Sequence, residues 1–205
     1  MYKIYLASKS PRRRELMAQI GLEFEVLVSY RDEIIAGNVP EEIVKELSMQ
    51  KAYEIERVLL EQCSGNLLNY HKVQGYDGVL IIGADTIVSM NDVILGKPKD
   101  EDDAFNMLKM LQGSQHIVST GVTIVGVNDD GRKAFNFAEN TAVSMYEMSD
   151  EEIRDYIATG EPMDKAGSYG IQGIGAKFIS GVNGDYNNVV GLPIGKIYQT
   201  IKTLQ

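Results

Sequence analysis

A short N-terminal segment combines hydroxyl groups, cations and the start of a predicted helix. Its sequence is Leu6-Ala7-Ser8-Lys9-Ser10-Pro11-Arg12-Arg13-Arg14-Glu15-Leu16. Ser10 suits the N-cap of a helix and Pro11 suits its first position. Three arginines in the first turn are repelled by the positive end of the helix dipole, which lowers stability unless an anion lies nearby. Backbone N–H groups, hydroxyls and guanidiniums at one helix start favour a phosphate-binding site, with a solvated basic turn as the alternative.

A carboxylate follows a continuous apolar run further along the chain. Asp85 comes directly after Val79–Ala84, and this run is typical of a strand buried on both faces. A carboxylate among apolar side chains is costly unless something binds it. A metal ion or a catalytic water would be such a partner, and a turn cap at the strand end is the simpler alternative. Asp85 is therefore the candidate for catalysis.

Two glycine-containing segments carry further candidates for nucleotide binding. Gly96-Lys97-Pro98 places a lysine beside a stiff residue, where it could bind phosphate as a point charge or lie solvated in a loop. Gly160–Gly173 holds four glycines, which permit close backbone approach to a ligand. Lys165 can neutralise phosphate, and the amide of Gln172 can both donate to and accept from a base edge. The alternative is an irregular loop with a structural ion pair between Asp164 and Lys165.

Composition restricts the classes of partner. The chain has 205 residues, 44% of them hydrophobic, and a net charge of −9, which disfavours binding to nucleic acid or to an anionic membrane surface. No run approaches 18 apolar residues, and no signal peptide is evident at the N-terminus. One cysteine, Cys63, permits no intrachain disulfide, which agrees with a reducing compartment. With two histidines and this one cysteine, a zinc site is disfavoured.

The segments that must position these residues alternate between strand and helix patterns. Residues 63–78 are rich in turn formers and predict a loop. The mixture predicts an α/β fold with a long central sheet. Strands are expected at Tyr2–Leu6, Phe24–Ser29, Val79–Met90, His116–Val127 and Lys133–Met145, and helices follow Ser10, Val39, Glu101, Ser149 and Leu192.

Five segments together resemble the successive motifs of the Maf family of nucleoside triphosphate pyrophosphatases. They occur in the family's order from about Ile4 to Ile197. The resemblance implies one domain over residues 1–205, an elongated two-lobed α/β fold with a cleft, and kinship with inosine triphosphate pyrophosphatases. It also implies a cytoplasmic enzyme that needs a divalent cation, Mg²⁺ or Mn²⁺. The segments are LASKSPRRREL, GADTIV, LGKPKDEDDAFNMLKMLQGSQHIVSTGV, GEPMDKAGSYGIQG and GDYNNVVGLPI.

The resemblance also implies roles for individual residues. Asp85 matches the family's proton acceptor, and Glu33 resembles an acidic residue on the metal side, so both are expected near the metal. Arg12, Thr86 and Gln172 match the specificity positions of the branch that prefers dTTP and UTP. Substrate binding is implied for Ser8, Ser10, Arg13, Lys51, Lys97 and Lys165.

Two functions from other classes stay open. A nucleotide-binding regulator of cell division would bind nucleotide tightly without turnover, and the family name is tied to septum formation. A nucleic-acid-binding protein using Arg12–Arg14 is disfavoured by the charge and by the lack of aromatic residues beside the arginines. The stretch 61–78 is long for the family. The sequence leaves the oligomeric state open, and a homodimer is compatible with it.

Overall fold

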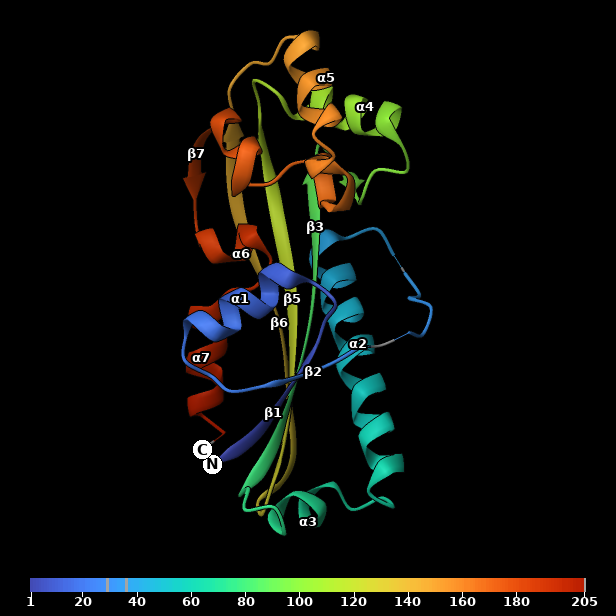
Figure 1. The fold of residues 1–205 in the computed structure, drawn as a ribbon, viewed down its shortest axis with the longest axis vertical. Helices are drawn as coiled ribbons and strands as arrows, with labels where there is room; N and C mark the ends of the chain where they lie inside the picture. Colours follow the sequence, from blue (N-terminus) through green and yellow to red (C-terminus); the bar gives the residue numbers. More distant parts are fainter. Residues whose placement is uncertain (29, 36, 205) are drawn as a thin grey trace. The chain divides into compact units, whose positions relative to one another are not determined.

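A computed structural model describes residues 1–28, 30–35 and 37–204. It is a mixed α/β structure with helices beside a seven-stranded sheet, which confirms the predicted fold class (Figure 1). The chain divides into two compact units. Unit 1 comprises Met1–Asp85, Gly121–Ala138 and Gly191–Gln205, and unit 2 comprises Thr86–Thr120 and Glu139–Val190.

Unit 1 contains a mixed sheet with helices on both faces (Figure 1). β1 pairs in parallel with both β2 and β3, and the strand order is β2-β1-β3-β5-β6. Three strands, β3, β5 and β6, also have residues in unit 2. The elements are β1 (Tyr2–Ala7), α1 (Pro11–Gln19), β2 (Glu25–Leu27), α2 (Pro40–Gln62), α3 (Leu67–Lys72), α7 (Ile194–Lys202) and parts of β3 (Gly78–Met90), β5 (Gln115–Asn128) and β6 (Gly131–Met145).

The apolar run before Asp85 is buried on both faces of the unit 1 sheet. Val79 and Ile81 belong to a core cluster with residues of α2, whereas Leu80 lies with Leu204 against Gly126. α2 and α7 accordingly flank the sheet on opposite sides (Figure 1). Two-sided burial explains why this strand shows no apolar–polar alternation.

Glycines allow α2 to approach the sheet closely. A Cβ on Gly83 would overlap the carbonyl oxygen of Ser48, and a Cβ on Gly121 would overlap that of Val44. Both carbonyls belong to α2, so these two strand glycines set how near the helix lies to β3 and β5. The same close approach brings side chains of α2 to the end of the apolar run.

Unit 2 has a separate core. α4 and α5 pack with strand residues such as Val88, Val118 and Val143. β4 pairs antiparallel with β3, and β7 pairs antiparallel with β6. The elements are β4 (Val93–Leu95), α4 (Glu101–Leu111), α5 (Asp150–Ala158), the 3₁₀ helices η1 (Glu161–Asp164), η2 (Ala166–Ser168) and η3 (Gly173–Phe178), β7 (Ile179–Asn183) and α6 (Tyr186–Val190).

Most predicted elements are confirmed, and one prediction is wrong. Residues 63–78, which the sequence predicts to form a loop, contain α3. Asn66 is the N-cap of this helix, and its side chain accepts a hydrogen bond from the backbone N–H of Asn69. His71 of this helix is buried and bonds the hydroxyl of Tyr5. The observed strand β2 spans Glu25–Leu27 and is shorter than the predicted strand Phe24–Ser29. Ser29 lies outside the described residues.

Among the helices that the structure describes, none combines the length and the apolar character that a bilayer crossing requires.

Candidate active site

The start of α1 has the geometry predicted for it. The Ser10 side chain accepts a hydrogen bond from the backbone N–H of Arg13, and Pro11 occupies the first turn. Ser8 is buried, and its Oγ accepts from the N–H of Ser10 at 3.2 Å. The two serines therefore fix the turn that leads into the basic helix start. A phosphate at this helix start remains a prediction, which the backbone geometry permits.

Arg13 is fixed by backbone carbonyls of unit 1. Its Nε donates to the oxygen of Gly191 at 2.8 Å, and its Nη1 donates to that of Ala84 at 2.9 Å. Burial lowers the pKa of the Arg13 guanidinium from its ordinary value, and the carboxylate of Asp85 acts against that shift. Arg13 thus places a positive charge beside the residue that precedes Asp85. Arg12 is half-buried in the same turn.

Lys51 of α2 joins the two acidic candidates of unit 1. Its Nζ forms an ion pair with Oδ1 of Asp85 and lies 3.1 Å from Oε1 of Glu33. The side chains of Lys51 and Asp85 are each 16% exposed, whereas that of Glu33 is 45% exposed. The lysine supplies the partner that a carboxylate at the end of a buried run requires. The turn-cap alternative for Asp85 is wrong, because Asp85 lies within β3 and pairs with Lys51.

Asp85 and Glu33 form a donor set that fits a magnesium or manganese ion brought with a nucleotide. Such ions are commonly held by one or two carboxylates together with phosphate oxygens and water. No group of three or more histidine, cysteine or acidic side chains that could hold a metal occurs within residues 1–28, 30–35 and 37–204. A metal at Asp85 and Glu33 would therefore need oxygens from the substrate.

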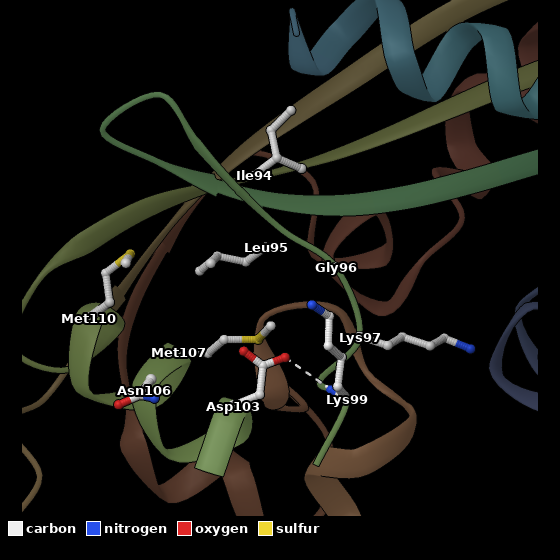
Figure 2. A pocket seen from close by; sticks show the side chains of 9 residues that line it. All are labelled: Ile94, Leu95, Gly96, Lys97, Lys99, Asp103, Asn106, Met107 and Met110. Atoms are coloured by element: carbon white, nitrogen blue, oxygen red, sulfur yellow. Dashed lines mark hydrogen bonds between the residues drawn. The ribbon is translucent and has the colours of Figure 1, made fainter. Parts of the chain in front are cut away.

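In unit 2, Lys97 extends from the edge of a pocket of about 410 Å³. Figure 2 shows its side chain directed away from Met107 and Asp103 on the pocket wall. Lys97 is exposed, and in the part of the chain that the structure describes its ammonium has no hydrogen-bond or ion-pair partner. Its ammonium is accessible both to a phosphate and to solvent, and its role in binding substrate stays a prediction.

Lys165 makes the structural contacts that the sequence offered as the alternative to phosphate binding. Its Nζ donates to Oδ1 of Asp164 at 2.8 Å and to the carbonyl oxygen of Glu161 at 2.5 Å. An ammonium has three donors, so one remains for a ligand. Its role in binding substrate stays a prediction.

The three specificity candidates have different surroundings. The Thr86 hydroxyl is 2.9 Å from that of Thr120, whose Oγ1 also donates to the carbonyl of Asn188. Gln172 is exposed at the start of η3, and its side-chain amide has no hydrogen-bond partner among the residues that the structure describes. Thr86 is therefore part of a hydrogen-bonded chain, whereas Gln172 presents an available amide.

Comparison with known proteins now identifies the family. The family model for "Maf-like protein" matches residues 3–204. The chain belongs to the Maf-like protein family. This membership agrees with the order of the motifs around Ser8, Asp85, Lys97 and Gln172.

Three relatives in the family align over nearly their whole length. A protein of Agathobacter rectalis is 51% identical over 205 residues, covering 100% of this chain and 98% of the relative. A protein of Lachnoclostridium phytofermentans is 44% identical, covering 98% and 95%. One from Geobacillus sp. is 43% identical, covering 100% and 99%. All three are named dTTP/UTP pyrophosphatase.

Solved structures match as well, and one of them shows how low the similarity is. It is a nucleoside-triphosphatase, dITP/XTP pyrophosphatase, from Mycobacterium abscessus, with a TM-score of 0.33 and 12% identity over 98% of this chain and 92% of that one. The kinship with inosine triphosphate pyrophosphatases stays a prediction.

Sequence reasoning missed the residues that hold the candidates in place. Thr120 and Asn188 support Thr86, and the carbonyls of Ala84 and Gly191 hold Arg13. These partners come from distant parts of the sequence. Every residue has a backbone carbonyl, so the residue type cannot indicate which carbonyls hold Arg13. Asn188 and Thr120 are polar residues whose burial is seen only in the folded protein, so their residue types gave no signal either.

Proposed function

We propose that this protein hydrolyses dTTP and UTP between the α and β phosphates, producing the nucleoside monophosphate and pyrophosphate. The observation that carries the proposal is the ion-paired group of Lys51, Asp85 and Glu33 in unit 1. It combines a candidate base, a cation and a second carboxylate, which are the components that phosphoryl transfer uses. Family membership and the names of the relatives support the same activity.

Asp85 is the proposed general base. Lys51 binds Oδ1 of Asp85, and Oδ2 has no hydrogen-bond partner among the described residues, so Oδ2 can accept a proton from water. The water oxygen bonds to the α phosphorus while the bond from that phosphorus to the bridging oxygen breaks. Pyrophosphate leaves with the bonding electrons, and Asp85 holds the proton.

Charge neutralisation and positioning supply most of the expected acceleration. Arg13 and Lys51 contribute fixed positive charge in unit 1, and Ser8 and Ser10 hold the helix start that would face phosphate. A divalent cation bound by Asp85 and Glu33 would neutralise phosphate charge and orient its oxygens. Substrate contacts by Lys97 and Lys165 of unit 2 belong to the same proposal.

Base choice is assigned to Arg12, Thr86 and Gln172. The exposed amide of Gln172 can accept from the imide N–H of uracil or thymine and donate to the adjacent carbonyl. The Thr86 hydroxyl is already bonded to Thr120, so we expect it to shape the site rather than move to the base.

The proposal also covers partners and context. The substrate is a nucleoside triphosphate, without nucleic acid or membrane partners, and the protein acts in the cytoplasm as one domain made of the two units. A homodimer is the expected assembly, which light scattering of the purified protein would test.

The deciding experiment measures pyrophosphate and phosphate release from a nucleotide panel with Mg²⁺ or Mn²⁺. Wild type is compared with Asp85→Ala and with Asp130→Ala, a control at an exposed turn. We expect pyrophosphate from dTTP and UTP, a loss of at least about 10³-fold in Asp85→Ala, and no loss in the control. Hydrolysis in ¹⁸O water should label the monophosphate, because the α phosphorus is attacked.

Other outcomes contradict the proposal in identifiable ways. Full activity of Asp85→Ala would remove Asp85 from catalysis. Label in pyrophosphate would place the attack on the β phosphorus. Tight nucleotide binding without turnover by the wild type would favour the regulator of cell division.

A further inference from the structure

The backbone on both sides of Gln172 is anchored by one pair of side chains. The backbone N–H of Gly170 donates to the hydroxyl of Tyr156 at 3.1 Å. The N–H groups of Ile174 and Gly175 donate to the two carboxylate oxygens of Glu161, at 2.9 and 3.0 Å. Gln172 lies between these anchored positions. Its exposed amide therefore stands on a short segment whose backbone is fixed before and after it.

Tyr156 and Glu161 are themselves joined. The Tyr156 hydroxyl donates to Oε1 of Glu161 at 2.8 Å, and Tyr156 is 1% exposed in the core of unit 2. Its ring contacts that of Phe178, which ends η3, in an edge-on arrangement. The anchor is thus tied to the packed interior rather than to another loop.

Glycines around Gln172 permit this close fit. A Cβ on Gly173, whose φ is +74°, would lie 2.6 Å from Oε2 of Glu161. A Cβ on Gly175 would overlap the hydroxyl of Tyr156. Gly173 and Gly175 are therefore explained by contact with the anchoring pair, and close approach to a ligand is not needed to explain these two glycines.

The charge of Glu161 is satisfied by these donors. Burial acts to raise the pKa of the Glu161 carboxyl, but the two backbone N–H groups and the Tyr156 hydroxyl outweigh it and lower the pKa. A carboxylate that accepts three hydrogen bonds is held in one place. It has little capacity left to bind a metal or a substrate, which separates it from the catalytic acids.

We propose that Tyr156 and Glu161 are positioning residues that hold Gln172 in the orientation needed to select the base. The inference rests on the proposed hydrolysis of dTTP and UTP and assigns to this pair the control of its specificity. Selection by hydrogen bonds requires a fixed donor and acceptor, because a mobile amide can turn to match cytosine as well as uracil.

The test uses the full-length protein with Glu161→Gln and Tyr156→Phe. Glu161→Gln keeps the shape but replaces one acceptor oxygen by a donor, so one of three hydrogen bonds is lost. Tyr156→Phe removes the hydroxyl that serves Gly170 and Glu161. We expect the ratio of kcat/KM for UTP to that for CTP to fall about tenfold in each variant, the effect of one hydrogen bond.

Ser149→Ala is the matched control for simple destabilisation. Ser149 caps the other end of the helix that carries Tyr156, and its Oγ accepts from the N–H of Glu152. Its loss weakens the same helix without touching the anchored segment. We expect rates for UTP and CTP to change together in this variant, so that their ratio stays constant.

A double-variant comparison separates positioning from other effects. Gln172→Ala should lower the ratio, and adding Glu161→Gln to it should lower the ratio no further, because the residue that Glu161 positions is gone. An additional fall in the double variant would overturn the inference. An unchanged ratio in Glu161→Gln and Tyr156→Phe, or in Gln172→Ala, would also overturn it while leaving the pyrophosphatase proposal intact.

The wild type separates the two proposals. If it hydrolyses dTTP and UTP and the anchoring variants keep the wild-type base ratio, only the positioning inference fails. If it releases pyrophosphate from no nucleotide, the proposed function fails and the inference falls with it. Should Glu161→Gln not fold, Tyr156→Phe provides the same measurement from the other side of Gln172.

Discussion

The charged candidates of unit 1 and the polar candidates of unit 2 are held in different ways. In unit 1, Lys51 pairs with Asp85 and Glu33, so that the functional groups hold one another. In unit 2, the amide of Gln172 has no partner among the described residues, and the neighbouring backbone is held by Tyr156 and Glu161. One arrangement fixes the reactive groups themselves, and the other fixes the chain that carries a recognition group.

This difference follows from the role proposed for each region, catalysis in unit 1 and base recognition in unit 2. Fixed charges accelerate a reaction because they need no reorganisation when charge develops, so mutual pairing suits the groups around Asp85. A base-reading amide must keep its donor and acceptor unused until the nucleotide arrives, so rigidity has to come from its backbone. Substitutions should therefore act differently in the two units.

After Asp85 itself, the largest effect is expected at Lys51. Lys51→Met removes the cation shared by Asp85 and Glu33, so two carboxylates lose their common partner and the phosphate loses a positive charge. We expect kcat/KM for dTTP to fall about 10²–10³-fold, as for other positioned donors. Arg57→Met is the control, since Arg57 lies on the same helix but pairs with Glu54 and Glu61 on the surface. Equal activity of both variants would contradict the paired arrangement proposed for unit 1.

The next effect concerns protonation in the core of unit 2. Burial lowers the pKa of His116 from 6.5 to about 4, and its Nε2 lies 2.7 Å from the Tyr169 hydroxyl. As the pH falls below 6.5, the unfolded chain binds a proton that the folded His116 refuses, so stability decreases until about pH 4. The loss approaches about 3 kcal/mol over that window.

His116→Gln isolates this contribution. Glutamine can keep a hydrogen bond to Tyr169 but does not titrate. Urea unfolding at pH 7.5, 5.5 and 4.5 should show a steeper loss of unfolding free energy in the wild type than in the variant. If the unfolding free energies of wild type and variant fell in parallel with pH, the pKa of His116 would be the same in the folded and unfolded protein.

The local features of both units could be predicted from the sequence. Ser10 and Pro11 mark the start of α1, and the Ser149–Glu152 capping box marks that of α5. These signals act within one turn of helix, so residue type and spacing contain them. α3 was missed even though Asn66 caps it, because the surrounding glycines and polar residues gave the stronger signal for a loop.

The contacts that position the candidate site could not be predicted in this way. Lys51 and Asp85 are 34 residues apart, and their pairing depends on how closely α2 approaches β3. Motif resemblance named both residues without indicating that they touch. The anchoring of Gln172 by Glu161 depends likewise on a turn that only the folded unit 2 brings together.

A smaller effect is expected where Arg13 is fixed by backbone oxygens. Arg13→Lys keeps the charge but cannot bridge the carbonyls of Ala84 and Gly191 with the same planar donors. We expect a loss of about 2 kcal/mol in the free energy of unfolding. Arg14→Lys should have almost no effect, since exposed Arg14 bonds only the carbonyl of Lys9 in the described chain. Thermal or urea unfolding compares the two, and equal stabilities would show that the bridge is dispensable.

The smallest effect tests the exposed lysine of unit 2. Lys97→Ala removes a charge that has no partner in the described protein, so folding should be unaffected, with a change within about 0.5 kcal/mol. A phosphate contact would be lost, and we expect kcat/KM to fall about tenfold. Lys99→Ala is the control, because the bond from Lys99 to Asp103 uses its backbone N–H and survives the substitution. A fall in stability would show that Lys97 serves the fold, and unchanged kinetics would leave it as a solvated loop lysine.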